Sequence, residues 1–210
     1  MAASRVAAYL KSEGEITDGG ELPEYVRGDK YVPYRIVGRV MGTELEGLHY
    51  QQLMPWVKPV EQTGAFAPKF VNDYAAAHPE KVFASEDGRD KFVEMESEAF
   101  RIILGDYVTT DDGTGIVHIA PTFGADDAKV AKDANIPALY LISKKGQTRP
   151  MVDLQGKYYT IEELDRNFVK ACVNEKAYGH HAGDYVKNSY DPRFNQTAYG
   201  TRRHLRRQKT

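Results

Sequence analysis

The sequence predicts an α+β domain in which many short strands form a barrel or a strongly curved sheet, with helices at its periphery. Segments rich in β-branched and aromatic residues, bounded by glycine and proline, recur within 31–50 and 100–119, which is typical of short strands in hairpins. Alanine-rich or amphipathic segments at 1–11, 126–135 and 160–172 predict helices. Short strands mixed with separate helices favour an α+β fold, and the frequent turns favour a curved sheet or barrel.

The first half of the chain contains a predicted helix, a group of strands and a charged stretch. Residues 1–11 are alanine-rich and predict a helix. The β-branched and aromatic residues of 31–40 and 42–50 predict strands separated by glycine turns. Residues 61–95 are charged and weakly patterned, so we expect an inserted or exposed lobe there, with one short helix before Pro79.

Strands alternate with a helix in the middle of the chain. Residues 100–104 and 107–110 predict two strands, and 116–119 predicts a short buried strand. An alanine-proline pair ends that strand before a glycine loop, and a helix follows at 126–135.

The last patterned part of the chain combines a strand, a turn and a capped helix. Residues 138–142 predict a buried strand and 144–148 a charged turn. Thr160 and Glu163 have the spacing of a capping box, in which each side chain bonds the backbone of the other. Apolar residues at helical spacing behind this cap predict a face packed on the core: Ile161, Leu164, Phe168, Val169 and Cys172.

Length and composition favour one cytoplasmic domain over residues 1–200. A chain of 210 residues that is 41% hydrophobic is long enough for one good core. No apolar run approaches the ~18 residues that a membrane helix needs, and the first ten residues lack the features of a signal peptide. Cys172 is the only cysteine, so neither an internal disulfide nor a cysteine-based zinc site can form.

The charge is distributed unevenly. Residues 201–210 contain five arginines and lysines and no acid, and removing them from the net charge of −2 leaves −7 for residues 1–200. An acidic body is a poor general binder of nucleic acid, because affinity for phosphates comes largely from basic residues. We expect 201–210 to be a disordered, solvated tail.

The stretch from Gly113 to Asp127 is the strongest candidate for a functional site. It joins a Gly113–Thr114–Gly115 turn, an apolar run that ends in His118, and the acids Asp126 and Asp127 at the start of a helix. Such strand-to-loop-to-helix junctions often form the floor and rim of a pocket. The dinucleotide fingerprint is excluded because its third glycine is replaced by His118, and the chain has no phosphate-binding loop.

Simpler interpretations of these residues stay open. His118 could be a histidine of the core, and either acid could stabilise the helix start, an effect of ~0.3 to 1 kcal/mol. Adjacent acids point in different directions, so one can cap while the other holds an ammonium group in a cleft. His118, Asp126 and Asp127 could also bind a metal, although they have no recognisable spacing motif.

Two ordered motifs resemble the editing insertion of the class I aminoacyl-tRNA synthetases for isoleucine, valine and leucine. The first is the 113–127 stretch, with its glycine-threonine-glycine turn, its alanine-proline pair and its glycine loop ending in an aspartate. The second is 42–50 followed by Pro55 and Trp56, which resembles the family's glycine, leucine, glycine, tyrosine and proline-aromatic pattern. His118 is typical of the isoleucine enzymes, and the resemblance is closest to their bacterial type.

The resemblance implies a β-barrel-like editing domain that hydrolyses valine from tRNA(Ile). Asp127 would bind the α-ammonium group of the misattached valine, and His118 would form the wall that excludes isoleucine. The Gly113, Thr114 and Gly115 turn would line the cleft near the terminal adenosine, with Asp126 as a further substrate-binding residue. Water is the expected nucleophile, because no serine or cysteine with a paired base is evident.

Departures from the family lead us to expect a fragment. The family's threonine-rich peptide and its two ATP-site motifs are missing from the sequence. We therefore expect no cofactor in this domain, with ATP and magnesium serving the full-length synthetase. Its partners would be the valine-carrying 3′ end of tRNA(Ile) and the rest of the synthetase chain, without a membrane. The alternatives are an inactive module that docks the tRNA end, or a metal-dependent hydrolase built on His118, Asp126 and Asp127.

Overall fold

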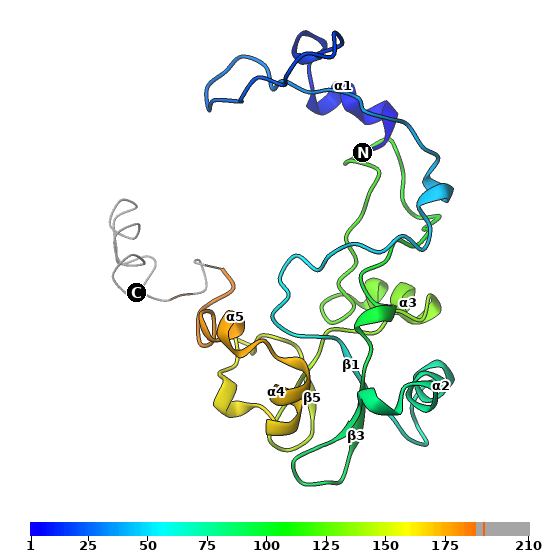
Figure 1. Ribbon diagram of the computed structural model, residues 1–210, viewed down its shortest axis with the longest axis vertical. Coiled ribbons are helices and arrows are strands. Elements are labelled where there is room, and N and C mark those ends of the chain that lie inside the picture. The colour runs from blue at the N-terminus through cyan, green and yellow to red at the C-terminus, as the bar shows by residue number, and fades with distance from the viewer. Residues whose placement is uncertain (188–190, 192–210) are drawn as a thin grey trace. The chain divides into compact units, whose positions relative to one another are not determined.

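The chain folds into two compact units. The computed structural model describes residues 1–187 and 191 (Figure 1). Unit 1 comprises Met1–Tyr50 and Arg101–Ile119, and unit 2 comprises Gln51–Phe100 and the described residues from Ala120 onward.

A three-stranded antiparallel sheet forms the first part of unit 2. Its strands are β1 (Val60–Gln62), β2 (Val82–Ala84) and β3 (Lys91–Glu94), in the order β1-β3-β2, and α2 (Lys69–Ala77) connects β1 to β2 (Figure 1). Successive side chains of a strand point to opposite faces. Accordingly, Phe92 of β3 lies in the main core, whereas Val93 packs in a smaller cluster with Val71 of α2.

A hairpin and a series of helices complete unit 2. Strands β4 (Leu141–Ile142) and β5 (Thr148–Arg149) pair antiparallel across a turn in which Gly146 has φ +72°. The 3-10 helix η4 (Pro79–Lys81) precedes β2 and η5 (Glu96–Glu98) follows β3. The later helices are α3 (Ala125–Asp133), the 3-10 helix η6 (Ile161–Glu163), α4 (Arg166–Cys172) and α5 (Glu175–Gly179). The main core combines apolar side chains of β1, β3, β4, α4, α5 and the connecting segments: Val57, Val60, Phe92, Leu141, Ile142, Met151, Leu164, Phe168, Val169, Cys172 and Tyr178.

Asp165 ties α4 to the sheet of unit 2. It is 1% exposed. One carboxylate oxygen accepts from the backbone N–H of Phe168 at 2.9 Å, which caps α4, and the other accepts from the N–H of Glu86 at 2.6 Å, in the turn between β2 and β3. Both oxygens are therefore bonded to buried or partly buried backbone, as a buried carboxylate requires.

We expect Asp165→Ala to lower the free energy of unfolding of unit 2 by about 2 to 4 kcal/mol, because two backbone donors lose a charged acceptor. Urea unfolding of the 210-residue chain measures the change. Asp133→Ala is the matched control, since Asp133 forms only an exposed i,i+4 pair with Lys129 and such pairs contribute less than about 1 kcal/mol. Equal effects of the two substitutions on the free energy of unfolding would contradict the stabilising role given to the two hydrogen bonds of Asp165.

Unit 1 has little regular structure and little buried surface. It contains α1 (Val6–Tyr9) and the 3-10 helices η1 (Ala3–Arg5), η2 (Ser12–Gly14) and η3 (Gly42–Leu45). Among its residues, all of which the structure describes, only Gly14 is buried. A Cβ at Gly14 would lie 2.3 Å from the carbonyl oxygen of Val32, so glycine is required at this close approach.

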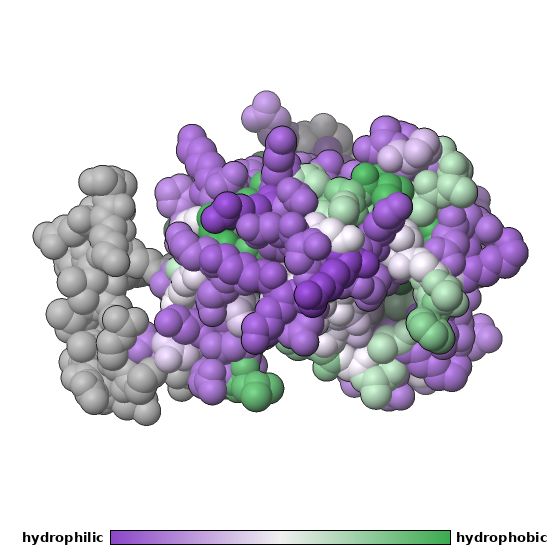
Figure 2. Space-filling view, turned by 90° about the horizontal axis from the view of Figure 1, so that it is seen from below, coloured by the Kyte–Doolittle hydropathy of each residue, from purple (hydrophilic) through white to green (hydrophobic). Residues whose placement is uncertain are grey.

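Large hydrophobic side chains are exposed in unit 1. Val37 is 93% exposed and Met41 69%. Exposed hydrophobic residues are not confined to unit 1, because Figure 2, which shows one face of the whole molecule, has hydrophobic residues lying among hydrophilic ones. Hydrogen bonds hold this unit together in place of a core, among them the pairs of Gly14 with Tyr34 and of Leu48 with Ile102, each at 2.9 Å.

Several predictions for unit 2 are confirmed. The helix predicted at 126–135 is α3, and the helix before Pro79 is α2. The buried strand predicted at 138–142 is present as the shorter β4. The capping box of Thr160 and Glu163 forms, with the Thr160 N–H donating to the Glu163 carboxylate at 2.7 Å. The predicted apolar face packs on the main core, although Asp165 divides its helix into η6 and α4.

The strands predicted in unit 1 are wrong. The segments 31–50 and 101–110 contain isolated bridges, Glu15 with Tyr34 and His49 with Arg101, and no strand. The run 116–119 is not a buried strand either, because Ile116 is 66% exposed and Val117 51%. β-Branched composition alone does not form a strand, since a strand is stabilised by a paired neighbour and by packing on one face.

The described strands form small sheets. The α+β class is confirmed, and the two sheets of the described residues do not close into a barrel. Residues 61–95, for which a lobe is predicted, form most of the three-stranded sheet and bury Phe92, Val93 and Met95. The tail at 201–210 lies outside the described residues, and the prediction of one domain over 1–200 stays a prediction.

In the described part of the chain, no helix has both the length and the apolar character needed to cross a membrane.

Candidate functional site

The Gly113–Thr114–Gly115 turn is a tight backbone reversal in unit 1. Gly113 has φ +56° and Gly115 φ +73°, which is the left-handed region that glycine enters without a steric cost. The Thr114 hydroxyl donates to the carbonyl of Ile116 at 3.2 Å. Thr114 therefore closes the turn locally, and the side chain does not depend on a distant residue for its position.

Arg5 contacts this turn from the start of the chain. Its Nε donates to the carbonyl of Gly113 and its Nη1 to the carbonyl of Asp111, each at 2.8 Å. The guanidinium also lies 5.9 Å from the centre of the Tyr9 ring. One planar side chain thus bonds two carbonyl groups of one turn, as the fixed fork of arginine allows.

Two neighbours of Arg5 contact the same segment. The N–H of Ala2 donates to the carbonyl of Thr114 at 2.7 Å, and the Ser4 hydroxyl donates to that of Thr110 at 3.3 Å. Gly115 packs against Ala2 so closely that a Cβ at residue 115 would lie 2.7 Å from the Ala2 Cβ. We call Ala2, Ser4 and Arg5 the N-terminal clamp. Sequence reasoning missed it, because no local pattern links residues that are more than 100 positions apart.

His118 lies in an extended segment of unit 1, and its side chain is exposed. The interpretation of His118 as a buried core residue is therefore wrong for this structure. An exposed imidazole is available to contact a ligand. This is what the predicted role of His118 as a wall that excludes isoleucine, a size filter, requires.

Asp126 and Asp127 occupy the first turn of α3, in unit 2. The Asp127 carboxylate accepts from the backbone N–H of Ala120 at 2.9 Å and closes the 120–127 loop. Asp126 is exposed. Gly124, the residue before the helix, has no side chain to cap it, so these acids are the negative charges nearest the positive end of the helix dipole.

The predicted site residues thus fall into two groups. Gly113, Thr114 and Gly115 form one turn of unit 1, and His118 lies in the same unit. Asp126 and Asp127 lie together in unit 2. Among the described residues, no group of three or more histidines, cysteines, aspartates or glutamates could hold a metal ion.

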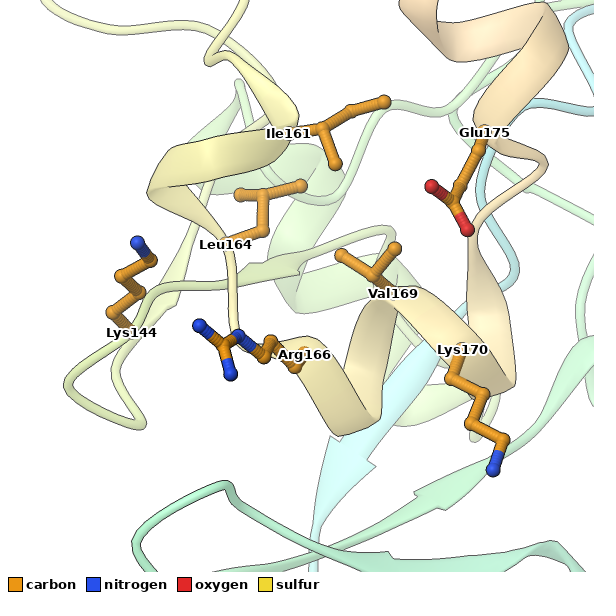
Figure 3. A pocket seen from close by; sticks show the side chains of 7 residues that line it. All are labelled: Lys144, Ile161, Leu164, Arg166, Val169, Lys170 and Glu175. Carbon is orange, nitrogen blue, oxygen red and sulfur yellow. The ribbon is translucent and has the colours of Figure 1, made fainter.

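A shallow pocket of about 280 Å³ lies elsewhere in unit 2, at the junction of η6, α4 and α5 (Figure 3). Ile161, Leu164 and Val169 supply its apolar lining. Charged side chains complete it: Lys144, Arg166, Lys170 and Glu175. Arg166 lies 3.5 Å from the carboxylate of Glu86. None of the site residues predicted from the sequence lines this pocket, which is a surface depression beside the main core.

Similarity to known proteins covers most of the chain. It is 51% identical over 174 residues to the isoleucine-tRNA ligase of Bacteroides thetaiotaomicron, a match that covers 83% of this chain and 13% of that enzyme. The isoleucine-tRNA ligases of Bacteroides fragilis and Porphyromonas gingivalis are 48% and 42% identical over 82% and 81% of the chain, and each match covers 12% of the enzyme. No protein-family model and no solved structure matches.

The chain spans about 13% of the length of the first of these relatives. Identity of this degree over four fifths of a chain is far above what unrelated sequences share, and it agrees with the resemblance carried by the two sequence motifs. The chain therefore belongs to the isoleucine-tRNA ligase family, in which it corresponds to one segment of the enzyme.

Proposed function

We propose that this chain is the editing segment of an isoleucine-tRNA ligase and hydrolyses valine from tRNA(Ile). The observation that carries the proposal is the match of its sequence to isoleucine-tRNA ligases over most of its length, in a segment that contains the Gly113–Gly115 turn, His118 and Asp127. Burial of one methylene is worth only about 0.8 kcal/mol, so a pocket for isoleucine also accepts valine. A second pocket that admits only valine removes the error.

Asp127 supplies the ammonium site in this proposal. A carboxylate has two acceptor oxygens, and the one bonded to the Ala120 N–H fixes the group in place. The other oxygen accepts a charge-assisted hydrogen bond from the α-ammonium group of valine. Asp126, exposed beside it, adds negative charge to the same helix start.

The remaining residues position the ester and set its size limit. His118 forms the wall that admits valine and excludes isoleucine, and the Gly113–Thr114–Gly115 turn borders the terminal adenosine. A water oxygen attacks the ester carbonyl carbon, the bond from that carbon to the ribose oxygen breaks, and the ribose oxygen takes up a proton. The products are free valine and uncharged tRNA(Ile), and catalysis comes mainly from positioning.

The partners in this proposal are the valine-carrying 3′ end of tRNA(Ile) and the rest of the ligase chain, in the cytoplasm. ATP and magnesium serve the charging reaction of the complete ligase. The hydrolysis assigned to this segment uses water alone.

A segment exchange tests the proposal. The matching part of the Bacteroides thetaiotaomicron ligase, to which this chain is 51% identical, is replaced by this chain. The control replaces the same part by a short glycine-serine linker. We expect the hybrid to deacylate valyl-tRNA(Ile) and the linker control to have lost this activity. A hybrid that still charges tRNA(Ile) with isoleucine but hydrolyses no valyl-tRNA(Ile) would overturn the proposal in favour of a module that only docks the tRNA end.

A further inference from the structure

The glycine-rich turn of the proposed editing site is held from outside its own sequence. Two of its three residues are glycines in the left-handed region, and glycine loses more conformational freedom on ordering than any other residue. The hydroxyl of Thr114 closes only the local reversal. A turn of this composition needs further contacts to present one conformation to a substrate.

The N-terminal clamp provides these contacts. The carbonyl groups of Thr110, Asp111, Gly113 and Thr114 each accept a hydrogen bond from Ala2, Ser4 or Arg5, over distances of 2.7 to 3.3 Å. Arg5 makes two of the four bonds, and its donors are charged, which roughly doubles the strength of such bonds. All of these contacts lie within unit 1.

We propose that Arg5 is a positioning residue for editing: its guanidinium fixes the Gly113–Thr114–Gly115 turn in the conformation that hydrolysis requires. This inference rests on the proposed function. Arg5 acts through the turn, because both of its hydrogen bonds end on backbone carbonyls. Lysine cannot replace it fully, since an ammonium group lacks the planar fork that bonds two carbonyls at once.

The test uses the full-length ligase that contains this chain as its segment. We compare Arg5→Ala, Arg5→Lys and, as a matched control, Arg39→Ala, because Arg39 is an exposed arginine of the same unit. Arg5→Ala is expected to lower kcat for hydrolysis of valyl-tRNA(Ile) about tenfold, the effect of losing a charge-assisted hydrogen bond. KM and the rate of charging with isoleucine are expected to stay within about twofold. The kcat of Arg5→Lys should lie between those of Arg5→Ala and the parent enzyme, and the kcat of Arg39→Ala should equal that of the parent enzyme.

Chemical rescue separates positioning from a general folding role. Millimolar methylguanidinium is expected to restore hydrolysis by Arg5→Ala, whereas methylammonium at the same concentration is not. An unchanged kcat in Arg5→Ala would overturn the inference. It would also be overturned by a loss that neither cation rescues and that is accompanied by an equal loss of charging, since this is the behaviour of a purely structural residue.

Failure of the proposed function is recognised separately. If the parent enzyme does not hydrolyse valyl-tRNA(Ile), the proposed function fails, and hydrogen exchange of the backbone then decides the positioning part alone. We expect the amide of Ala2, which donates to Thr114, and the amides of the turn to exchange faster in Arg5→Ala than in Arg39→Ala. Equal exchange in the two variants would show that Arg5 does not position the turn.

Discussion

Replacement of Asp127 by alanine in the full-length ligase is expected to slow the hydrolysis of valyl-tRNA(Ile) by about 10- to 100-fold, because the substrate ammonium loses a charge-assisted hydrogen bond of about 1.5 to 3 kcal/mol. The measurement is single-turnover deacylation of preformed valyl-tRNA(Ile). Charging of tRNA(Ile) with isoleucine should not change, since Asp127 is assigned to editing only.

Asp127→Asn distinguishes substrate binding from loop closure. An asparagine oxygen can still accept from the N–H of Ala120, the bond that Asp127 makes at 2.9 Å, but the side chain has no charge for an ammonium group. We expect the rate of valyl-tRNA(Ile) hydrolysis to fall in Asp127→Asn by most of the factor by which it falls in Asp127→Ala. Full activity in Asp127→Asn would restrict Asp127 to closing the loop, and Asp133→Ala, at the far end of α3, serves as the unaffected control.

Local patterns predicted α2 and the later elements of unit 2 well because these are determined by short-range chemistry, but they did not predict the three strands at 60–94. The capping box of Thr160 and Glu163 involves residues only three positions apart, and the acids at the start of α3 act on the same helix turn. The apolar face behind the cap identified much of the main core. The pattern did not show that Asp165 would interrupt this helix, because its second partner, Glu86, is 79 positions away.

Unit 1 could not be predicted in the same way. Its segments have the β-branched and aromatic composition of strands, but in the structure they find only isolated bridges and bury almost nothing. Strand formation depends on pairing and on a covered face, and neither can be read from composition.

The candidate site shows the same division. The positive φ angles at Gly113 and Gly115 agree with the tight turn that the glycines predicted. Arg5 reaches that turn across 108 positions of sequence, and no spacing rule connects the two. The residues that we propose for substrate binding were chosen from sequence patterns, whereas the contact of Arg5 with the turn was not visible in the sequence.

His118→Ala is expected to create hydrolysis of correctly charged isoleucyl-tRNA(Ile), which we expect the parent enzyme to leave intact. In the proposed site the His118 imidazole forms one wall of a valine-sized pocket and excludes isoleucine by steric overlap, so its removal would leave space for more than the one additional methylene. Hydrolysis of valyl-tRNA(Ile) should persist, because the ammonium site at Asp127 is retained. The measurement is deacylation of both charged tRNAs by the same enzyme, together with the net yield of isoleucyl-tRNA(Ile), which should fall.

Two further variants make the size filter falsifiable. His49→Ala changes another exposed histidine of unit 1 and should leave isoleucyl-tRNA(Ile) protected. His118→Trp fills the pocket further, so it should slow valine removal as well. Only a steric wall predicts opposite effects for Ala and Trp at one position, since loss of a proton-transfer group would slow hydrolysis of both esters in both variants. If His118→Ala still protected isoleucine, discrimination would have to come from other residues of the pocket.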